Sequence, residues 1–324
     1  MPFKTLVLGR RHAGQTLAAI LTSEMGLSRR NIEHSLKNRW VRLDGVLCQK
    51  PGLRVRTGQR LQVVVPRDKK PAADAPRTDK LLPLARAIRI VYLDEHIVVV
   101  DKPAGLTTVR HADETKAFGG RAQRFLPPTL VDLLPSLLPS SSQGRIRAVH
   151  RLDKETSGLI VLARSAAAES ELGMQFRAHT MERTYLALVR GPAQDERIES
   201  HLVADRGDGR RGSSADGTGQ HAVTHVRVVE PLGAFTLVEC RLETGRTHQV
   251  RIHLGERGFP LCGERVYDRP LHGQPLPDTS GAKRPMLHAA TLALTHPATG
   301  KRIAWEMKMP NDMRGLLQHL RSNK

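Results

Sequence analysis

The 324-residue sequence is poor in cysteine and has no long apolar run. Its three cysteines, Cys48, Cys240 and Cys262, lie far apart without CxxC spacing, which argues against a disulfide framework and against a cysteine-rich zinc site. No run approaches the roughly 18 apolar residues of a membrane span, and the N-terminal apolar run is too short for a signal peptide. We therefore expect a soluble protein in the reducing cytoplasm, with no membrane partner.

Aromatic residues are also scarce, at 3% of the chain, which argues against a surface that binds single strands by stacking bases. Basic residues are abundant: 51 Lys and Arg against 32 Asp and Glu give a formal net charge of +19. Residues 1–70 hold +11 of this charge. Such an excess attracts a polyanion, so the N-terminal fifth is predicted to bind nucleic acid by charge and shape.

Two helices are predicted near the N-terminus. Apolar residues at helical spacing predict a first helix from Leu17 to Met25 that ends near Gly26. Ser28 is a suitable cap for a second helix over residues 29–38. Basic side chains on and beside this second helix suit a phosphate backbone: Arg29, Arg30, Lys37 and Arg39.

A hairpin and a further strand follow these helices. Asp44-Gly45 lies between two short strand-like runs, a strong signal for a tight hairpin, and Arg60 to Val65 is predicted as a strand. This order of elements resembles the small S-four RNA-binding domain, which is named after a ribosomal small-subunit protein. Residues 1–66 are therefore expected to form an α/β RNA-binding domain. The alternative is a small domain whose charges only keep it soluble.

Residues 67–85 are rich in Pro, Ala and charge and are predicted to be a linker. Residues 86–324 are predicted to form one larger domain in which strands dominate: 89–92, 97–100, 159–163, 185–189, 222–229, 235–240 and 302–307. Three helices are expected, over 165–178, 247–256 and 312–322. Because strands and helices do not alternate strictly, we predict an α+β fold with a mixed, mainly antiparallel sheet flanked by helices and loops.

The segment HRLDKETSG, residues 150–158, contains the first chemical candidate, Asp153. Alone, an acid two residues after an arginine indicates an ordinary ion pair at a strand edge. Other chemistry has less support. His248 and His253 are spaced i,i+5, which does not place both rings on one helix face for a metal, and no GxSxG motif suggests a nucleophilic serine. A carboxylate with an arginine partner remains.

Five segments in one order resemble the RluA-type pseudouridine synthases. They are DKPAGL (101–106), HRLDKETSGLIVLA (150–163), ERTYLALVRG (182–191), LETGRTHQVRIHL (242–254) and RPMLHAATLALTHP (284–297). The resemblance covers about residues 88–310, and a preceding S-four-like domain is the arrangement of the branch that modifies ribosomal RNA. Two departures preserve charge: Arg183 replaces a commoner lysine, and Gly263-Glu264 replaces the usual Gly-Asp.

The resemblance implies that the protein isomerises uridine to pseudouridine in RNA. The bond from uracil N1 to ribose breaks, the base turns and C5 rejoins the ribose, which requires no cofactor and no metal. The uridine must first leave its stack. Asp153 matches the catalytic aspartate, and three routes stay open for it: attack on the ribose, attack on the base, or removal of the 2′ proton.

The resemblance also gives roles to neighbouring residues. Because a partly buried carboxylate needs a close cation to stay ionised, we expect Arg246 of the GRTHQ motif to pair with Asp153. Tyr185 matches the tyrosine that stacks on the base. Arg151 is expected to fill the gap left by the flipped uridine or to contact a phosphate. Four further residues are expected to support the site or to bind RNA: Lys102, His150, His248 and Gln249.

The expected substrate is large-subunit ribosomal RNA, free or in a pre-ribosomal particle, and the enzyme is expected to be a monomer. One alternative is the same chemistry on transfer RNA. Another is a non-catalytic RNA-binding or ribosome-assembly protein. The presence of Asp153, Tyr185 and Arg246 together argues against this last alternative, because phosphates repel a carboxylate and binding alone does not require one.

Overall fold

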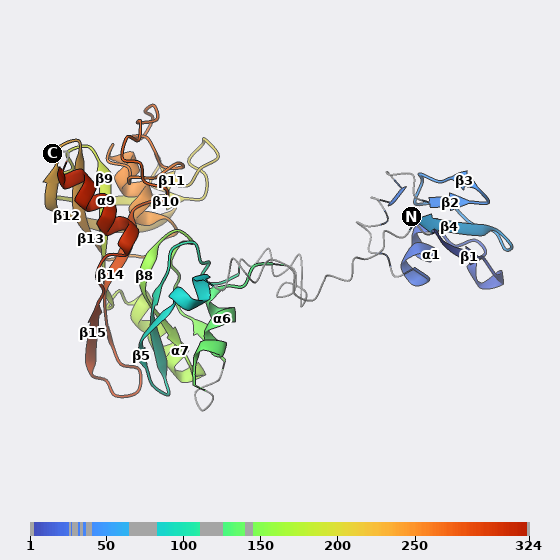
Figure 1. Cartoon of the computed structure of the whole chain (residues 1–324), viewed down its shortest axis with the longest axis horizontal. Helices are drawn as coiled ribbons and strands as arrows, with labels where there is room; N and C mark the ends of the chain where they lie inside the picture. Colours follow the sequence, from blue (N-terminus) through green and yellow to red (C-terminus); the bar gives the residue numbers. More distant parts are fainter. Residues whose placement is uncertain are drawn as a thin grey trace. The chain divides into compact units, whose positions relative to one another are not determined.

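The computed structural model describes residues 3–25, 27, 32, 35–36, 41–64, 83–110, 126–139 and 145–322. The chain divides into two compact units, Met1–Thr78 and Asp79–Lys324 (Figure 1). Most of the predicted linker lies outside the described residues, and its last residues belong to a short helix at 83–87. None of the described helices is both long and apolar enough to cross a bilayer.

The N-terminal unit contains a four-stranded antiparallel sheet with the order β1-β4-β2-β3. Its strands are β1 (Phe3–Val7), β2 (Val41–Leu43), β3 (Val46–Leu47) and β4 (Arg60–Val64). Strand β1 was not predicted from the sequence. The hairpin between β2 and β3 is confirmed: Asp44 has φ 51° and Gly45 has φ 81°, the positive values that a type I′ turn requires at both central residues.

One helix of this unit, α1 (Leu17–Ser23), lies fully within the described residues. The side chain of Thr16 caps it by accepting a hydrogen bond from the Ala19 amide, and its apolar side chains pack in a core with those of the sheet. The helix is confirmed, although it ends two residues earlier than predicted. The four basic residues expected on the second helix lie outside the described residues.

The larger unit is built on one sheet with the strand order β11-β10-β12-β13-β9-β14-β8-β6-β5. Two further strands join it: β15 pairs with β14, and β7 pairs with β8. Among the described strands of this sheet, β8 and β14 run parallel to each other and the other pairs are antiparallel. The strands are β5 (Arg89–Leu93), β6 (Ile97–Lys102), β7 (Arg147–Ala148), β8 (Ser157–Ala163), β9 (Glu182–Arg190), β10 (Glu196–Val203), β11 (Gly212–Ser213), β12 (Gln220–Leu232), β13 (Phe235–Leu242), β14 (Leu287–Thr295) and β15 (Arg302–Glu306). The predicted mixed, mainly antiparallel sheet is confirmed.

Besides the short helix at 83–87, the described part of the unit contains four helices beside the sheet: α6 (Leu130–Leu137), α7 (Ala166–Arg177), α8 (Gln249–Glu256) and α9 (Asn311–Ser322). The last three were predicted to within two residues. Ser165 caps α7 as expected, because its hydroxyl accepts a hydrogen bond from the Ala168 amide. The sequence did not lead us to α6, which contains Pro135.

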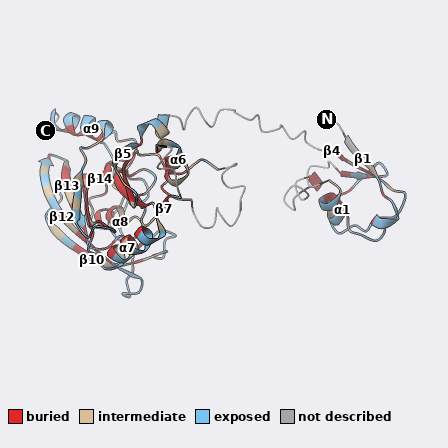
Figure 2. Ribbon diagram, turned by 90° about the horizontal axis from the view of Figure 1, so that it is seen from below, coloured by how far each residue is buried: buried red, intermediate tan, exposed pale blue. Residues whose placement is uncertain are grey.

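Two hydrophobic clusters cover opposite faces of β6 and β8, whose side chains are all buried (Figure 2). On one face, Val98, Val100, Ile160 and Leu162 pack in a cluster that includes residues of α6 and α8. On the other face, Ile97, Val99, Leu159 and Val161 pack against Ala168 and Leu172 of α7. Burial on both faces explains the continuous apolar runs of these strands and fixes the loops at their ends.

The Gly-rich segment 205–220 is held in place at both sides. It contains β11, which pairs with β10, and the buried side chain of Arg206 forms an ion pair of 2.8 Å with Glu256 of α8.

Candidate active site

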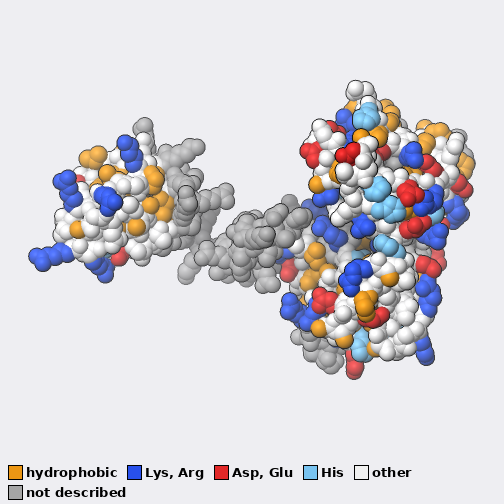
Figure 3. Space-filling view, turned by 180° about the vertical axis from the view of Figure 1, so that it is seen from behind, with side chains coloured by type: hydrophobic (Ala, Val, Ile, Leu, Met, Phe, Trp, Pro, Cys, Tyr) orange, Lys and Arg blue, Asp and Glu red, His pale blue; other side chains and the backbone are white. Residues whose placement is uncertain are grey.

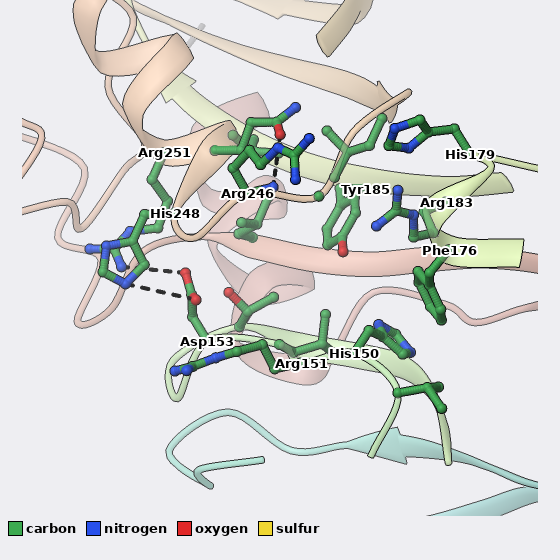
Figure 4. Close-up of a pocket in the computed structure, with 18 of the residues that line it drawn as sticks. His150, Arg151, Asp153, Phe176, His179, Arg183, Tyr185, Arg246, His248 and Arg251 are labelled. Atoms are coloured by element: carbon green, nitrogen blue, oxygen red, sulfur yellow. Dashed lines mark hydrogen bonds and ion pairs between the residues drawn. The ribbon is translucent and has the colours of Figure 1, made fainter. Parts of the chain in front are cut away.

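A pocket of about 440 Å³ lies in the larger unit. Its walls come from the loop before β8, from β9, and from the turn that leads from β13 into α8 (Figure 4). Asp153, Tyr185 and Arg246 all line it, so the structure brings together the three predicted catalytic residues. Lys, Arg and His side chains are visible on the face of this unit seen in Figure 3, interspersed with Asp and Glu.

Asp153 faces two nitrogen-bearing side chains of the α8 region. Its Oδ2 atom is 3.5 Å from Nη1 of Arg251, and its Oδ1 atom is 3.8 Å from Nε2 of His248 (Figure 4). The side chain of Asp153 is 18% exposed. A partly buried carboxylate is thus held beside a guanidinium and still has access to a ligand in the pocket.

Arg251 is itself held by Glu264. The guanidinium Nε and Nη2 atoms donate to the two carboxylate oxygens of Glu264 at 2.7 and 2.9 Å. Burial alone raises the pKa of Glu264, but hydrogen bonds from Arg251 and from backbone amides lower it below its ordinary value. Glu264, whose side chain is fully buried, is therefore ionised and fixes the guanidinium next to Asp153.

The predicted pairing of Asp153 with Arg246 is wrong. The Arg246 Nε atom donates to the carbonyl of His221 at 2.9 Å, and among the described residues the guanidinium within 4 Å of Asp153 is that of Arg251. The reason is local geometry. His248 adopts a left-handed conformation with φ 60°, and α8 starts immediately after it, so the chain changes direction between the two arginines.

His248 also contacts Tyr267. Its Nδ1 atom lies 2.8 Å from the hydroxyl of Tyr267, while its Nε2 atom faces Asp153. Burial lowers the pKa of His248, although the nearby charge of Asp153 opposes this shift. A neutral imidazole that accepts from Tyr267 at Nδ1 carries its proton at Nε2, on the side of Asp153.

Tyr185 lies on β9 and is 8% exposed. Burial is the main cause that raises the pKa of its phenol; Arg183 opposes this rise and Asp153 adds to it. A phenol with a raised pKa stays protonated at neutral pH and is a poor base. Its ring is better suited to contact a base than to accept a proton.

Two predicted RNA contacts prove to be buried supports. The ammonium of Lys102 is fully buried and donates to the carbonyls of Pro103, Leu106 and Lys154 at 2.9, 2.8 and 3.2 Å. These bonds tie the turn after β6 to the loop that carries Asp153. Gln249, 3% exposed, uses its amide to bond Thr244, Thr224 and two backbone groups. Gln249 also lines the pocket, with its amide bonded within the protein.

A glycine also fixes the loop that carries Asp153. Gly158, the second residue of β8, has φ 113°, and a Cβ atom there would overlap the backbone of Ala289 on the neighbouring strand β14. A side chain at this position would force the two strands apart.

The remaining predicted contacts differ in exposure. Arg151 is exposed at the pocket, next to Asp153 in the chain (Figure 4). The His150 ring packs 4.5 Å from that of Phe176, centroid to centroid, and its Nε2 atom accepts a hydrogen bond of 3.2 Å from the Val161 amide. In the described part of the chain, no group of three or more His, Cys, Asp and Glu side chains could hold a metal ion.

Comparisons with known proteins show which proteins the chain is similar to. The family profile described as RNA pseudouridylate synthase matches residues 96–256. "Ribosomal large subunit pseudouridine synthase D" of Zymomonas mobilis is 34% identical over 328 residues, which cover 99% of this chain and 98% of that protein. The protein of the same name from Nitrosomonas europaea is 39% identical over 240 residues, which cover 72% of this chain and 66% of that protein. The solved structure "Human RNA Pseudouridylate Synthase Domain Containing 4" shares the fold, with a TM-score of 0.57 and 24% identity over 76% of this chain and 97% of its own.

The neutral state of His150 predicts a pH dependence of stability. Burial, helped by the charge of Arg183, lowers the pKa of His150 from 6.5 to about 3. Below pH 6.5 His150 therefore binds a proton in the unfolded chain but not in the folded chain. The free energy of unfolding falls for this reason as the pH decreases from about 6.5 towards 3. In urea unfolding, His150→Gln should lose less stability than the wild type between pH 7 and 4.

The control is Gln318→Ala, an exposed position on α9 without a titratable side chain, which should follow the wild-type pH dependence. Equal loss of stability in His150→Gln and the wild type would show that His150 does not titrate in this way.

Proposed function

The chain belongs to the RNA pseudouridylate synthase family, and we propose that it converts specific uridines of large-subunit ribosomal RNA to pseudouridine. The single observation that carries the assignment of the site is Asp153, which faces a pocket beside Arg251 and shares that pocket with Tyr185. The relatives named for the ribosomal large subunit support ribosomal RNA over transfer RNA as the substrate.

We assign the central step to Asp153. The N1–C1′ bond of the flipped uridine breaks, the base turns in the pocket, and C5 bonds to C1′. Asp153 attacks the ribose, attacks the base or removes the 2′ proton, and each route requires an ionised carboxylate. The Arg251 guanidinium lies 3.5 Å from the Asp153 carboxylate and orients it, and Glu264 keeps Arg251 in place.

Other residues of the pocket bind and orient the nucleotide. Tyr185 offers its ring to the base, and Arg246 contributes a cation to the same pocket. Arg151, exposed next to Asp153, is placed to enter the space that the flipped uridine leaves or to contact a phosphate. Extrusion of the base and the turn within the pocket leave the redox state of the nucleotide unchanged.

The N-terminal unit is proposed to anchor the RNA. Its four-stranded sheet, its capped helix and the excess of basic residues in the first 70 positions support an S-four-like RNA-binding domain over residues 1–66. Residues 86–324 form the catalytic domain in this proposal. We propose that the enzyme works as a monomer in the cytoplasm, where ribosomal RNA is made and modified.

The first test follows proton release from uracil C5. The wild-type protein is incubated with an unmodified large-subunit ribosomal RNA transcript tritiated at C5, and release into water is counted. We expect release by the wild type and none above background by Asp153→Asn, whose RNA affinity should stay within about twofold because the change removes only a negative charge. Asp208→Asn, at a half-exposed surface carboxylate, is the matched control and should behave as the wild type.

Two results would overturn this proposal. Absence of release from ribosomal RNA and from total cellular RNA by the wild type would remove the enzymatic function. Equal loss of binding and release in Asp153→Asn would instead give Asp153 a structural role.

The second test concerns the anchor. A variant of the full chain in which Arg29, Arg30, Lys37 and Arg39 are replaced by Gln should bind the ribosomal RNA transcript more weakly. The slope of log K against log salt should fall by up to about 3, since each lost phosphate contact on a single strand reduces it by about 0.7. The rate of tritium release at saturating RNA should not change.

The matched control removes four arginines that are exposed and paired with carboxylates: Arg197, Arg227, Arg302 and Arg321. Their replacement by Gln should have a smaller effect on the slope. If the two variants had equal slopes of log K against log salt, the N-terminal unit would not be the anchor for the RNA.

A further inference from the structure

Arg183 is a buried cation that has no anionic partner in the described part of the chain. It lies on β9 and is 7% exposed, and its Nε atom is buried with no hydrogen-bond partner. Among the described residues, no carboxylate lies within 4 Å of this guanidinium. In contrast, Arg251 in the same pocket is paired with Glu264 and Asp153.

The surroundings of Arg183 orient the guanidinium without neutralising it. Its central carbon lies 5.3 Å from the centroid of the Phe176 ring, a cation–π contact that supplies no negative charge. The bare Gly245 makes room for it, since a Cβ atom at that position would overlap Nη1 of Arg183. Arg246 is near enough that its charge lowers the pKa of Arg183 further, after the larger effect of burial.

This arrangement is costly for the free protein. A buried charge that lacks a partner destabilises the folded state, and two neighbouring cations repel each other. Arg183 lines the pocket, so a bound ligand can supply the missing negative charge. The local packing holds the cation in place before any such ligand arrives, and this is the preorganisation that stabilises charge developing during a reaction.

The position of Arg183 indicates which part of an RNA ligand it meets. Arg183 and Tyr185 are two residues apart on β9, so their side chains point to the same face about 7 Å apart, and Figure 4 shows the guanidinium beside the Tyr185 ring. A pyrimidine that contacts Tyr185 therefore has an edge towards Arg183. The deep burial of Arg183 favours the base, which enters the pocket, over a phosphate, which belongs to the RNA backbone.

Resting on the proposed function, we propose that Arg183 is a further catalytic residue, one that stabilises the negative charge that the uracil ring carries when it is detached from ribose. When the N1–C1′ bond breaks, both bonding electrons stay with the base, which becomes the uracil anion with charge on N1, O2 and O4. C1′ is completed by a bond to Asp153 or by a C1′–C2′ double bond after the 2′ proton is lost.

The remaining steps neutralise the uracil anion. The turned anion uses an electron pair at C5 to bond to C1′, which releases Asp153 or restores the 2′ proton. The C5 proton is then lost to solvent and N1 takes up a proton, so atoms and redox state balance. If Asp153 attacks the base instead, the ring also gains negative charge, on O4. Arg183 thus serves all three open routes.

The test separates the chemical step from binding. Tritium release is measured in single turnovers with excess enzyme on the tritiated ribosomal RNA transcript, and the Kd is measured in parallel. We expect Arg183→Met to slow release about 10²-fold, the cost of losing one preorganised donor, with the Kd within about twofold. Arg183→Lys keeps the charge, and its rate of tritium release should be within about tenfold of the wild-type rate.

Stability supplies a second, independent readout. Since Met fills the buried space without an unpaired charge, Arg183→Met should melt at a higher temperature than the wild type while reacting more slowly. If Arg183→Met does not fold, Arg183→Gln takes its place in the rate comparison. The matched control is Arg227→Met, an exposed position on β12, which should leave the rate and the Kd unchanged.

Three results would overturn the assignment. An unchanged rate in Arg183→Met would leave only a packing role. A higher Kd with a flatter salt dependence and a normal rate at saturation would make Arg183 a phosphate contact. Equal losses in Arg183→Lys and Arg183→Met would exclude a role for the charge. Tritium release by the wild type tests the proposed function itself, so failure of that function can be distinguished from failure of the assignment of Arg183.

Discussion

The ion pair between Arg251 and the fully buried Glu264 is the interaction on which the pocket depends. An enzyme that acts on RNA through a carboxylate must hold that group in position, although the surrounding phosphates repel it. A mobile surface arginine would be drawn to the RNA backbone instead. Glu264 prevents this, because two short hydrogen bonds fix the guanidinium with its remaining nitrogen towards Asp153. The proposed catalytic carboxylate, Asp153, is thus positioned through a second carboxylate, Glu264, whose side chain is fully buried.

Three basic side chains in and beside the pocket serve different purposes because they have different partners. Arg251 is shared by two carboxylates, and Arg183 has no anion among the described residues. Lys102, beside the pocket, donates to three backbone carbonyls, and burial lowers its pKa to about 7. Arg251 orients Asp153, and Lys102 holds the loop that carries Asp153. In our proposal, Arg183 is left for the negative charge that appears during the reaction. The partner of each basic side chain, rather than its charge alone, thus distinguishes a residue that supports the site from one that we assign to the reaction.

Much of the fold was readable from the sequence, where local signals and burial agree. The apolar runs of β6 and β8 reflect strands covered on both faces, and the Asp44-Gly45 hairpin and the Ser165 cap have specific backbone requirements. Strand β10 was missed because its sequence, ERIESHLV, is largely polar, and α6 because Pro135 interrupts its helical pattern. In the site, the order of motifs led to Asp153 and Tyr185. It did not lead to Arg251, because the left-handed turn at His248 decides which arginine reaches Asp153. No sequence signal indicated that the ammonium of Lys102 is buried.

The most direct measurement compares Arg251→Met with Arg246→Met in single-turnover tritium release from large-subunit ribosomal RNA at saturating enzyme. If Arg251 holds the Asp153 carboxylate in its reactive position, Arg251→Met should lower the rate about 10²- to 10³-fold. Arg246→Met should mainly weaken RNA binding and leave the saturated rate within about tenfold of the wild type. A severe loss of rate in Arg246→Met with a near-normal rate in Arg251→Met would contradict the assignment of Arg251 as the partner of Asp153.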